Sequence, residues 1–317
     1  MIEEIEKLKK IELHLHLDGS VRIETVEELL NKKNLEKEMR GNNCKNLEEY
    51  LTKFTYPLKV MQTKENLERI AYELCLDLKK DNVIYAEIRF APNKHTENLS
   101  LVEVVDSVLK GLRKSDIKTN LILCCMRGDS LEENLKIVSL AKKYKNKGVV
   151  AIDLAGDEKN YPNELYNSIF EACRREDIPY TIHSGEAAGV DSIKTAISFQ
   201  TKRIGHGIAA IQSEDIIKEI KEKKITLEIC PTSNIDTFAV VNMENHPIKK
   251  LYEKGILVTI NTDNRTVSNT TLNKEYEKLF NSLHFTINDF IKMNKMALAA
   301  SFLTREAKEK LLDELEK

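Results

Sequence analysis

The sequence has few cysteines, no long apolar run and no clear excess of either charge, and each shortage narrows the kind of protein that it encodes. The six Cys residues include no C-x-x-C pair, which disfavours both a disulfide framework and a thiolate zinc site. Lys and Arg number 49 against 51 Asp and Glu, so the net charge of -2 provides no long-range attraction for nucleic acid. We therefore expect a small-molecule substrate, with no nucleic acid and no protein partner implied.

No segment has the apolar length of a membrane span, and residues 1–7 are acidic and lack the continuous apolar region of a signal peptide. No stretch rich in Pro, Gly and Ser divides the chain either. Hydrophobic residues make up 41% and charged residues 32%, which is enough for a core and for a water-exposed surface. These features predict a single domain, residues 1–317, in a reduced, cytoplasmic setting and away from membranes.

Short apolar segments alternate with segments of helical periodicity along most of the chain. The strand candidates are residues 11–17, 83–90, 117–126, 148–154, 178–182, 203–208, 225–229 and 256–260. The helix candidates between them include residues 67–80, 101–114, 132–144 and 215–222. Because eight such units close a parallel barrel, we predict an α/β fold of the (β/α)₈ or TIM barrel type.

The interval between the first two strand candidates is the longest and predicts additional helices. Residues 26–37 have the pattern of one helix, and an apolar stripe at helical spacing follows: Leu47, Tyr50, Leu51 and Phe54. One interpretation of this stripe is an extra helix packed on the barrel. The other is an apolar wall for a flat ligand, because long loops after barrel strands lie at the catalytic face and often act as lids.

The first strand candidate carries two histidines on one face. Strict alternation places His14, His16 and Asp18 on the face opposite Ile11. Two imidazoles that point the same way suit two ligands of one metal ion, although a solvated polar strand face has the same pattern. Their position at a strand end favours the metal, since the active sites of barrels lie at the carboxyl ends of the strands.

Polar residues also follow three other strand candidates, and each has a structural alternative. His183 and Glu186 follow residues 178–182, where a helix-capping turn is the alternative. His206 stands between two Gly residues, as a turn histidine would, and Asp263 lies where an Asx-type turn is the alternative. The remaining histidines are expected at the surface: His95, His246 and His284.

The common position of these residues decides between the interpretations. Five of them fall at predicted strand ends: His14, His16, His183, His206 and Asp263. One metal site explains this arrangement better than several separate coincidences. A centre of nitrogen and oxygen ligands without thiolates suits a catalytic zinc ion with one position open for water.

Seven segments, in their order, resemble the adenosine deaminase family, and the resemblance extends from residue 10 to about residue 276. They are residues 12–20 (ELHLHLDGS), 85–92 (YAEIRFAP), 150–158 (VAIDLAGDE), 183–186 (HSGE), 203–207 (RIGHG), 228–231 (EICP) and 261–264 (NTDN). The resemblance implies a zinc-dependent enzyme of purine salvage. Its substrate would be a purine nucleoside, adenosine and 2′-deoxyadenosine, which it would deaminate hydrolytically to the 6-oxo product and ammonia.

The resemblance also assigns roles to individual residues. One Zn²⁺ per chain would be bound by His14, His16, His183 and Asp263. Glu186 would protonate the purine N1, and His206 would take or steer the water proton and stabilise the developing charge. Substrate contacts are implied for His16, Asp18 (ribose hydroxyl), Gly156 (its N–H to purine N3) and Asn264 (purine N7), with Ser233 behind the metal ligands.

Asn264 is a departure from the family pattern, because many members carry a second Asp there. A carboxylate can donate a hydrogen bond to N7 only when it is protonated, whereas an amide donates at every pH. Asn264 is therefore compatible with deamination.

Four alternatives remain. An adenine deaminase, or another 6-aminopurine deaminase, would share the metal and Glu186, but Asp18 favours a nucleoside because base-specific relatives tend to have Glu there. A phosphotriesterase-type hydrolase commonly uses two metals and a bridging Lys, and no Lys stands at a suitable strand end. A deaminase of flipped bases needs P-C-x-x-C, which is absent, although His95–Glu97 fits its H-x-E. A growth-factor-like binding protein would not require the complete set of catalytic residue types.

Overall fold

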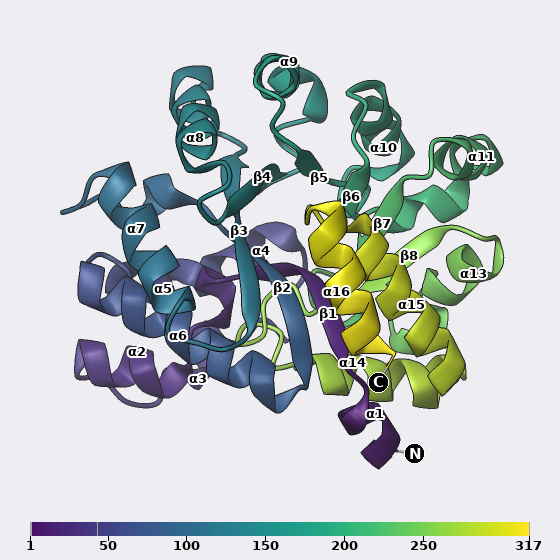
Figure 1. Cartoon of the computed structure of the whole chain (residues 1–317), viewed down its shortest axis with the longest axis horizontal. Coiled ribbons are helices and arrows are strands. Elements are labelled where there is room, and N and C mark those ends of the chain that lie inside the picture. Colours follow the sequence, from purple (N-terminus) through teal and green to yellow (C-terminus); the bar gives the residue numbers. More distant parts are fainter. Residues whose placement is uncertain (1, 43, 317) are drawn as a thin grey trace.

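The computed structural model describes residues 2–42 and 44–316, and eight parallel strands form its centre (Figure 1). Each strand pairs with the next one along the chain. The strands are β1 (Lys10–His16), β2 (Val83–Phe90), β3 (Lys118–Met126), β4 (Val149–Ala155), β5 (Tyr180–Ser184), β6 (Arg203–His206), β7 (Thr226–Ile229) and β8 (Leu257–Ile260). All eight predicted strands are present.

The sheet closes on itself just beyond β8. The backbone N–H of His16 donates to the carbonyl of Asp263 at 2.7 Å, and the N–H of Asp263 donates to the carbonyl of His14 at 3.0 Å. These bonds form a parallel bridge between Leu15 and Asp263. The predicted (β/α)₈ barrel is therefore confirmed, and its seam runs through three of the residues that the sequence marks as metal ligands.

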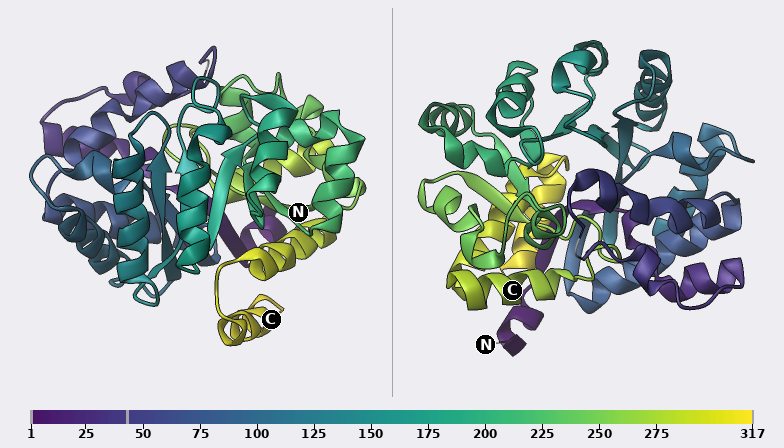
Figure 2. Two further views of the ribbon diagram at one scale, coloured as in Figure 1. Left: turned by 90° about the horizontal axis from the view of Figure 1, so that it is seen from above. Right: turned by 180° about the vertical axis from the view of Figure 1, so that it is seen from behind.

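Helices surround the barrel, and most follow a strand in the order of the chain (Figure 2). They are α1 (Ile2–Lys7), α2 (Ile23–Leu30), α3 (Glu36–Met39), α4 (Leu47–Leu51), α5 (Thr55–Val60), α6 (Lys64–Lys80), α7 (Leu101–Leu112), α8 (Leu131–Tyr144), α9 (Asn167–Arg175), α10 (Gly189–Ser198), α11 (Glu214–Glu222), α12 (Pro231–Asp236), α13 (Ile248–Glu253), α14 (Leu272–Leu283), α15 (Ile287–Ala300) and α16 (Arg305–Leu315). None of the helices in the described part of the chain is long and apolar enough to cross a membrane.

Several of these helices begin at a residue that satisfies their free N–H groups. At α7 the side chain of Ser100 accepts from the N–H of Glu103, and the Glu103 carboxylate accepts from the N–H of Ser100. Ser130 and Glu133 form the same capping box at α8. Such caps stabilise a helix by about 1 kcal/mol each and fix where it starts.

The long interval after β1 holds four short helices, α2 to α5, as the expectation of additional helices requires. The prediction of one continuous helix over residues 26–37 is wrong. α2 ends at Leu30, because Asn31 adopts a left-handed conformation with φ 48° and closes the helix, and α3 begins only at Glu36. Asn34 is also left-handed, with φ 63°, which keeps the connection from continuing as helix.

The two ends of the barrel are covered by different elements. Figure 1 shows α15 and α16 across one end, and the chain between them reaches Arg203, the first residue of β6, where the guanidinium lies 4.1 Å from the ring of Phe302. This is the amino-terminal end of the strands. At the opposite, carboxyl-terminal end, Leu47 of α4 lines a pocket together with His16, the last residue of β1.

Candidate active site

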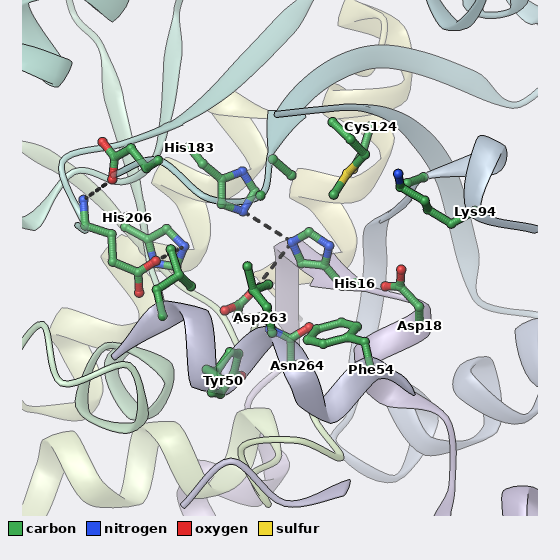
Figure 3. Close-up of a pocket in the computed structure, with 18 of the residues that line it drawn as sticks. His16, Asp18, Tyr50, Phe54, Lys94, Cys124, His183, His206, Asp263 and Asn264 are labelled. Carbon is green, nitrogen blue, oxygen red and sulfur yellow. Dashed lines mark hydrogen bonds and ion pairs between the residues drawn. The ribbon is translucent and has the colours of Figure 1, made fainter. Parts of the chain in front are cut away.

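Five side chains converge at the carboxyl ends of the strands. His14, His183, His206 and Asp263 each offer one ligand atom, and these atoms lie within 4.8 Å of one another. His16 joins them, with its Nε2 3.3 Å from Nε2 of His183 and 3.4 Å from Oδ1 of Asp263 (Figure 3). The structure thus brings together all the candidate metal ligands and His206, from β1, β5, β6 and the turn after β8.

The backbone at these strand ends allows the close approach. His206 and Asp263 have φ values of 61° and 59°, so the chain turns sharply immediately at the cluster. At Gly205 a Cβ would lie 3.0 Å from Cε1 of His14 and 3.2 Å from Cα of His183. A larger residue at this position would crowd the imidazole of His14 and the backbone of His183.

Buried carboxylates orient two of the imidazoles. Nδ1 of His14 lies 2.9 Å from Oε2 of Glu228, and Nδ1 of His183 lies 3.1 Å from Oδ1 of Asp153. Arg89 donates to both carboxylates, at 2.8 Å to Glu228 and 3.0 Å to Asp153. Because the ionised carboxylates can only accept, both Nδ1 atoms carry the proton and both Nε2 atoms present a lone pair to the cluster.

This arrangement fits a metal ion. Nε2 of His14 is buried without a hydrogen-bond partner, and it lies 3.3 Å from Oδ1 of Asp263. A nitrogen lone pair that faces a carboxylate oxygen repels it unless a cation lies between them. Ser233 donates to the other oxygen of Asp263 at 2.6 Å, which holds that carboxylate in place and agrees with the expected position of Ser233 behind the ligands. A set of imidazoles and one carboxylate is typical of a catalytic zinc site.

Glu186 lies beside the cluster and has an acid–base character of its own. Burial raises the pKa of its carboxyl to about 7, and the nearby charge of Asp263 acts in the same direction. Its Oε1 accepts hydrogen bonds from Asn234 and Thr237, both at 2.9 Å. Its Oε2 lies 3.5 Å from Nε2 of His206, whose pKa burial lowers to about 4. At neutral pH the site therefore combines a carboxyl poised near its pKa with a neutral imidazole.

The helix-capping turn that was the alternative interpretation of the segment after β5 is not observed. α10 begins only at Gly189, and its first residues receive no side-chain cap. The turn is held instead by Glu158, whose carboxylate accepts from the N–H groups of Glu186 at 3.1 Å and of Ala187 at 2.7 Å, and also from Gly185. The sequence analysis did not identify this function of Glu158, although the residue ends one of the quoted motifs.

Two of the three histidines expected at the surface are buried. His95 has no exposed surface and packs against Phe90, with ring centroids 5.7 Å apart. His246 is 2% exposed and contacts Asn234. Only His284 is exposed, as expected. Polar neighbours in the sequence made His95 and His246 look like surface residues, but the fold brings distant segments over them.

A pocket opens next to the cluster, and the expected substrate contacts line it: His16, Asp18, Gly156 and Asn264. Its apolar wall includes Leu47, Tyr50, Leu51 and Phe54, so the stripe in the long interval lines this pocket. Figure 3 shows Asp18, Phe54 and Asn264 around the same space. Burial raises the pKa of Asp18 to about 7. Gly19 is required beside it, because any Cβ there would collide with the amide of Asn264.

Several residues of this pocket were not identified by the sequence analysis, and the charged side chain of Lys94 is one of them. It lies in the short 3₁₀ helix Pro92–His95 after β2, and its Nζ donates to Oδ1 of Asp129 at 2.8 Å. Its charge is therefore balanced outside the metal cluster.

The barrel and this buried cluster define a class: a (β/α)₈ enzyme with a thiolate-free metal site at the carboxyl ends of its strands. Within this class, the sequence model described as adenosine deaminase matches residues 9–317. The chain belongs to the adenosine deaminase family.

Individual relatives agree with this assignment. The adenosine deaminase of Clostridium acetobutylicum is 44% identical, and the match covers 99% of each chain. The adenosine deaminase of Clostridium botulinum is 43% identical over 96% of this chain and 97% of the relative. Among solved structures, Arabidopsis ADAL complexed with IMP is similar with a TM-score of 0.90 and 27% identity, covering 99% of this chain and 98% of that one.

Proposed function

We propose that this chain catalyses the hydrolytic deamination of adenosine and 2′-deoxyadenosine, with one zinc ion per chain, in purine salvage. The observation that carries the proposal is the position of Glu186, a carboxyl with a pKa of about 7, beside a cluster of metal-ligand type in the same pocket. The relatives named adenosine deaminase, at 43% and 44% identity, support the choice of substrate.

Zinc would be held by His14, His16, His183 and Asp263. Glu228 and Asp153 orient the Nε2 lone pairs of His14 and His183 toward the cluster, which supports these two histidines as ligands. When bound, zinc supplies the Lewis acidity that makes water a nucleophile near neutral pH.

Glu186 protonates N1 of the purine, which makes C6 electrophilic. It can do so because, with a pKa of about 7, a fraction of the Glu186 carboxyl groups is protonated at neutral pH. His206 takes or steers the proton of the attacking water and stabilises the charge that develops at C6. Asp18 accepts from a ribose hydroxyl, the N–H of Gly156 contacts N3, and the amide of Asn264 donates to N7. The apolar wall excludes water from the reacting atoms.

Metal content and an absorbance assay test this proposal together. Elemental analysis is expected to find one zinc ion per chain, and the protein is expected to convert adenosine and to lose this activity on chelation until zinc is restored. Absence of a transition metal, two metals per chain at full activity, or failure to convert adenosine would each contradict the proposal.

A further inference from the structure

Behind Glu186 and His206 lies a line of buried polar groups that no step of the proposed reaction uses. Asn234, in α12, has no exposed surface and does not line the pocket, and His246 lies behind it with 2% of its surface exposed. Both side chains are hydrogen bonded in series toward the active site. Buried polar groups in series fix one another's orientation, because each donor must meet an acceptor.

A backbone N–H group at one end determines which atom donates and which accepts in each hydrogen bond of this series. The backbone N–H of Ile248 can only donate, and it lies 3.2 Å from Nδ1 of His246. Nδ1 of His246 is therefore without a proton. Burial lowers the pKa of His246 to about 3, so the ring is neutral and its proton is on Nε2. Nε2 then donates to Oδ1 of Asn234 at 3.3 Å, which fixes which end of the amide is oxygen.

The nitrogen of the same amide consequently faces the catalytic groups. Nδ2 of Asn234 lies 2.9 Å from Oε1 of Glu186 and 3.0 Å from Nδ1 of His206, and it has two hydrogens to donate. The reversed amide would place its oxygen against Oε1 of Glu186 and its nitrogen against the proton of His246. The observed orientation is the one in which every group has a partner.

From this geometry we infer that Asn234 and His246 are positioning residues for the reaction, which hold His206 as a hydrogen-bond donor through Nε2 and direct the transferable proton of Glu186 to Oε2. The inference rests on the proposed function, in which Glu186 is the acid. Because Nδ1 of His206 accepts from Asn234, Nδ1 carries no proton and the proton of the ring is on Nε2, which donates to the oxygen that develops charge at C6. In this tautomer His206 steers the water and stabilises charge, and it does not act as the base.

Glu186 is directed by the same amide. Two donors occupy Oε1, from Asn234 and Thr237, so the carboxyl proton resides on Oε2, the oxygen that faces His206. A proton on Oε1 would weaken the bonds that this oxygen accepts from Asn234 and Thr237, because a hydroxyl oxygen is a poorer acceptor, and it would turn the acidic hydrogen away from Oε2. Without Asn234 only Thr237 would donate to Oε1, and the preference of the proton for Oε2 would weaken.

Three variants separate positioning from mere packing. Asn234→Asp keeps the shape but removes the donor, and we expect kcat to fall about 10²-fold with KM little changed. His246→Leu removes the donor that fixes the amide, and we expect a loss of about 10-fold in kcat. His246→Gln is its matched control, because the amide nitrogen of Gln can donate from the position of Nε2. It should restore kcat close to the wild-type value.

Nitrogen-15 NMR of the histidine rings provides a readout that does not depend on activity. In the zinc-loaded wild type, His206 and His246 are both expected as Nε2–H tautomers, and in Asn234→Asp His206 is expected to change to the Nδ1–H tautomer. A wild-type His206 with its proton on Nδ1 overturns the inference even if no variant folds. Full kcat in both Asn234→Asp and His246→Leu also overturns it. Failure of the wild type to deaminate adenosine would refute the proposed function instead, and the tautomers would still decide this inference.

Discussion

Two layers of buried ionisable side chains lie inside the barrel, and they differ in how their charges are balanced. Toward the amino-terminal end, Arg203 contacts the carboxylates of Glu87 and Glu228, and the other oxygen of Glu228 reaches His14 of the cluster. All three of these charged side chains are essentially without exposed surface. At the carboxyl-terminal end, the side chains of Asp263 and Glu186 are each 6% exposed, but no Lys or Arg of the described residues forms an ion pair with either.

The pKa values of two glutamates show what this difference means. Burial acts to raise the pKa of Glu228, but Arg203 and Arg89 overcome it and hold the pKa well below its usual range. Glu186 lacks such a partner, and burial raises its pKa to about 7. The balanced layer, formed by Arg203, Glu87 and Glu228, can therefore stabilise the fold at every physiological pH. In the unbalanced layer, formed by Asp263 and Glu186, no Lys or Arg of the described residues neutralises the carboxylates. This layer can therefore bind a metal cation and keep a carboxyl proton.

The largest expected effect comes from the unbalanced layer. Glu186→Gln keeps the size of the side chain but cannot deliver a proton to N1, so kcat should fall by about 10²–10⁴-fold. Zinc content should be unchanged, because Glu186 is outside the proposed ligand set. Steady-state kinetics with elemental analysis checks both, and a near-normal kcat in the zinc-loaded variant would show that Glu186 is not the acid.

Removing a charge from the balanced layer should damage stability. Arg203→Met leaves Glu87 and Glu228 buried beside an apolar side chain, and loss of one partner of a buried ion pair destabilises by about 3–5 kcal/mol. Arg305→Met is the matched control, since Arg305 and Glu309 are exposed and such pairs contribute about 0–1 kcal/mol. Urea denaturation measures both. Equal effects of the two substitutions would mean that the buried ion pairs of Arg203 contribute no more to stability than the exposed pair of Arg305.

Glu186 should also connect stability to pH. Its pKa is raised from 4.5 to about 7 in the folded protein, so its contribution to stability is complete below pH 4.5 and is lost as the pH rises through about 7. The gap corresponds to about 3 kcal/mol. Metal-free Glu186→Gln should therefore gain stability over the wild type as the pH is raised from 4.5 to 8, as measured by chemical denaturation. A constant difference across that range would contradict the raised pKa.

The unbalanced layer was the easier one to predict from the sequence. Each metal-ligand candidate stands at the end of a clear apolar run, and all parallel strands of a barrel end on the same side, so local patterns already implied a shared location. The eight strand positions were recognisable for the same reason: buried strands are apolar runs bounded by polar turns. Strand ends moved by at most two residues, as in β5, because hydrogen bonding and not hydropathy sets them.

Features that depend on distant partners could not be predicted. Nothing near Glu158 in the sequence indicates that it accepts from backbone N–H groups of residues 185–187. His246 stands among polar residues, and its burial depends on the segments that pack over it. The break between α2 and α3 requires that Asn31 and Asn34 adopt a left-handed conformation. Asn tolerates this conformation, but its presence in a sequence does not show that the conformation is adopted.

Substrate choice should depend on the uncompensated carboxylate of Asp18. A hydrogen bond from a ribose hydroxyl to this charge contributes about 1.5–3 kcal/mol, or about 10- to 150-fold in kcat/KM. At pH 8, above its pKa of about 7, adenosine should be strongly preferred to adenine, and the phosphate of AMP should be repelled. Asp18→Ala should narrow the gap between adenosine and adenine at constant zinc content. A wild type that prefers adenine or AMP, or a variant that discriminates equally well, would exclude Asp18 as the ribose contact.

The smallest effect concerns the wall of the pocket. Phe54 lines the pocket and is only partly buried, with its ring 6.4 Å from that of Tyr50, whereas Tyr50 is 1% exposed and its hydroxyl lies 2.7 Å from Oγ of Ser268. Val267 belongs to the same apolar cluster but does not line the pocket. These differences separate ligand contact from packing within one small group of residues.

Phe54→Ala should therefore raise the KM for adenosine far more than it lowers the melting temperature. Losing about 1.4 kcal/mol of apolar contact with the nucleoside corresponds to about a 10-fold rise in KM. Val267→Ala is the matched control: it should lower the free energy of unfolding by about 0.5–3 kcal/mol and leave KM unchanged. Kinetics and thermal denaturation of both variants decide the matter. A Phe54→Ala protein that is much less stable but has the wild-type KM would assign the stripe to packing, because a residue that only packs on the barrel affects the folded state and not the bound substrate.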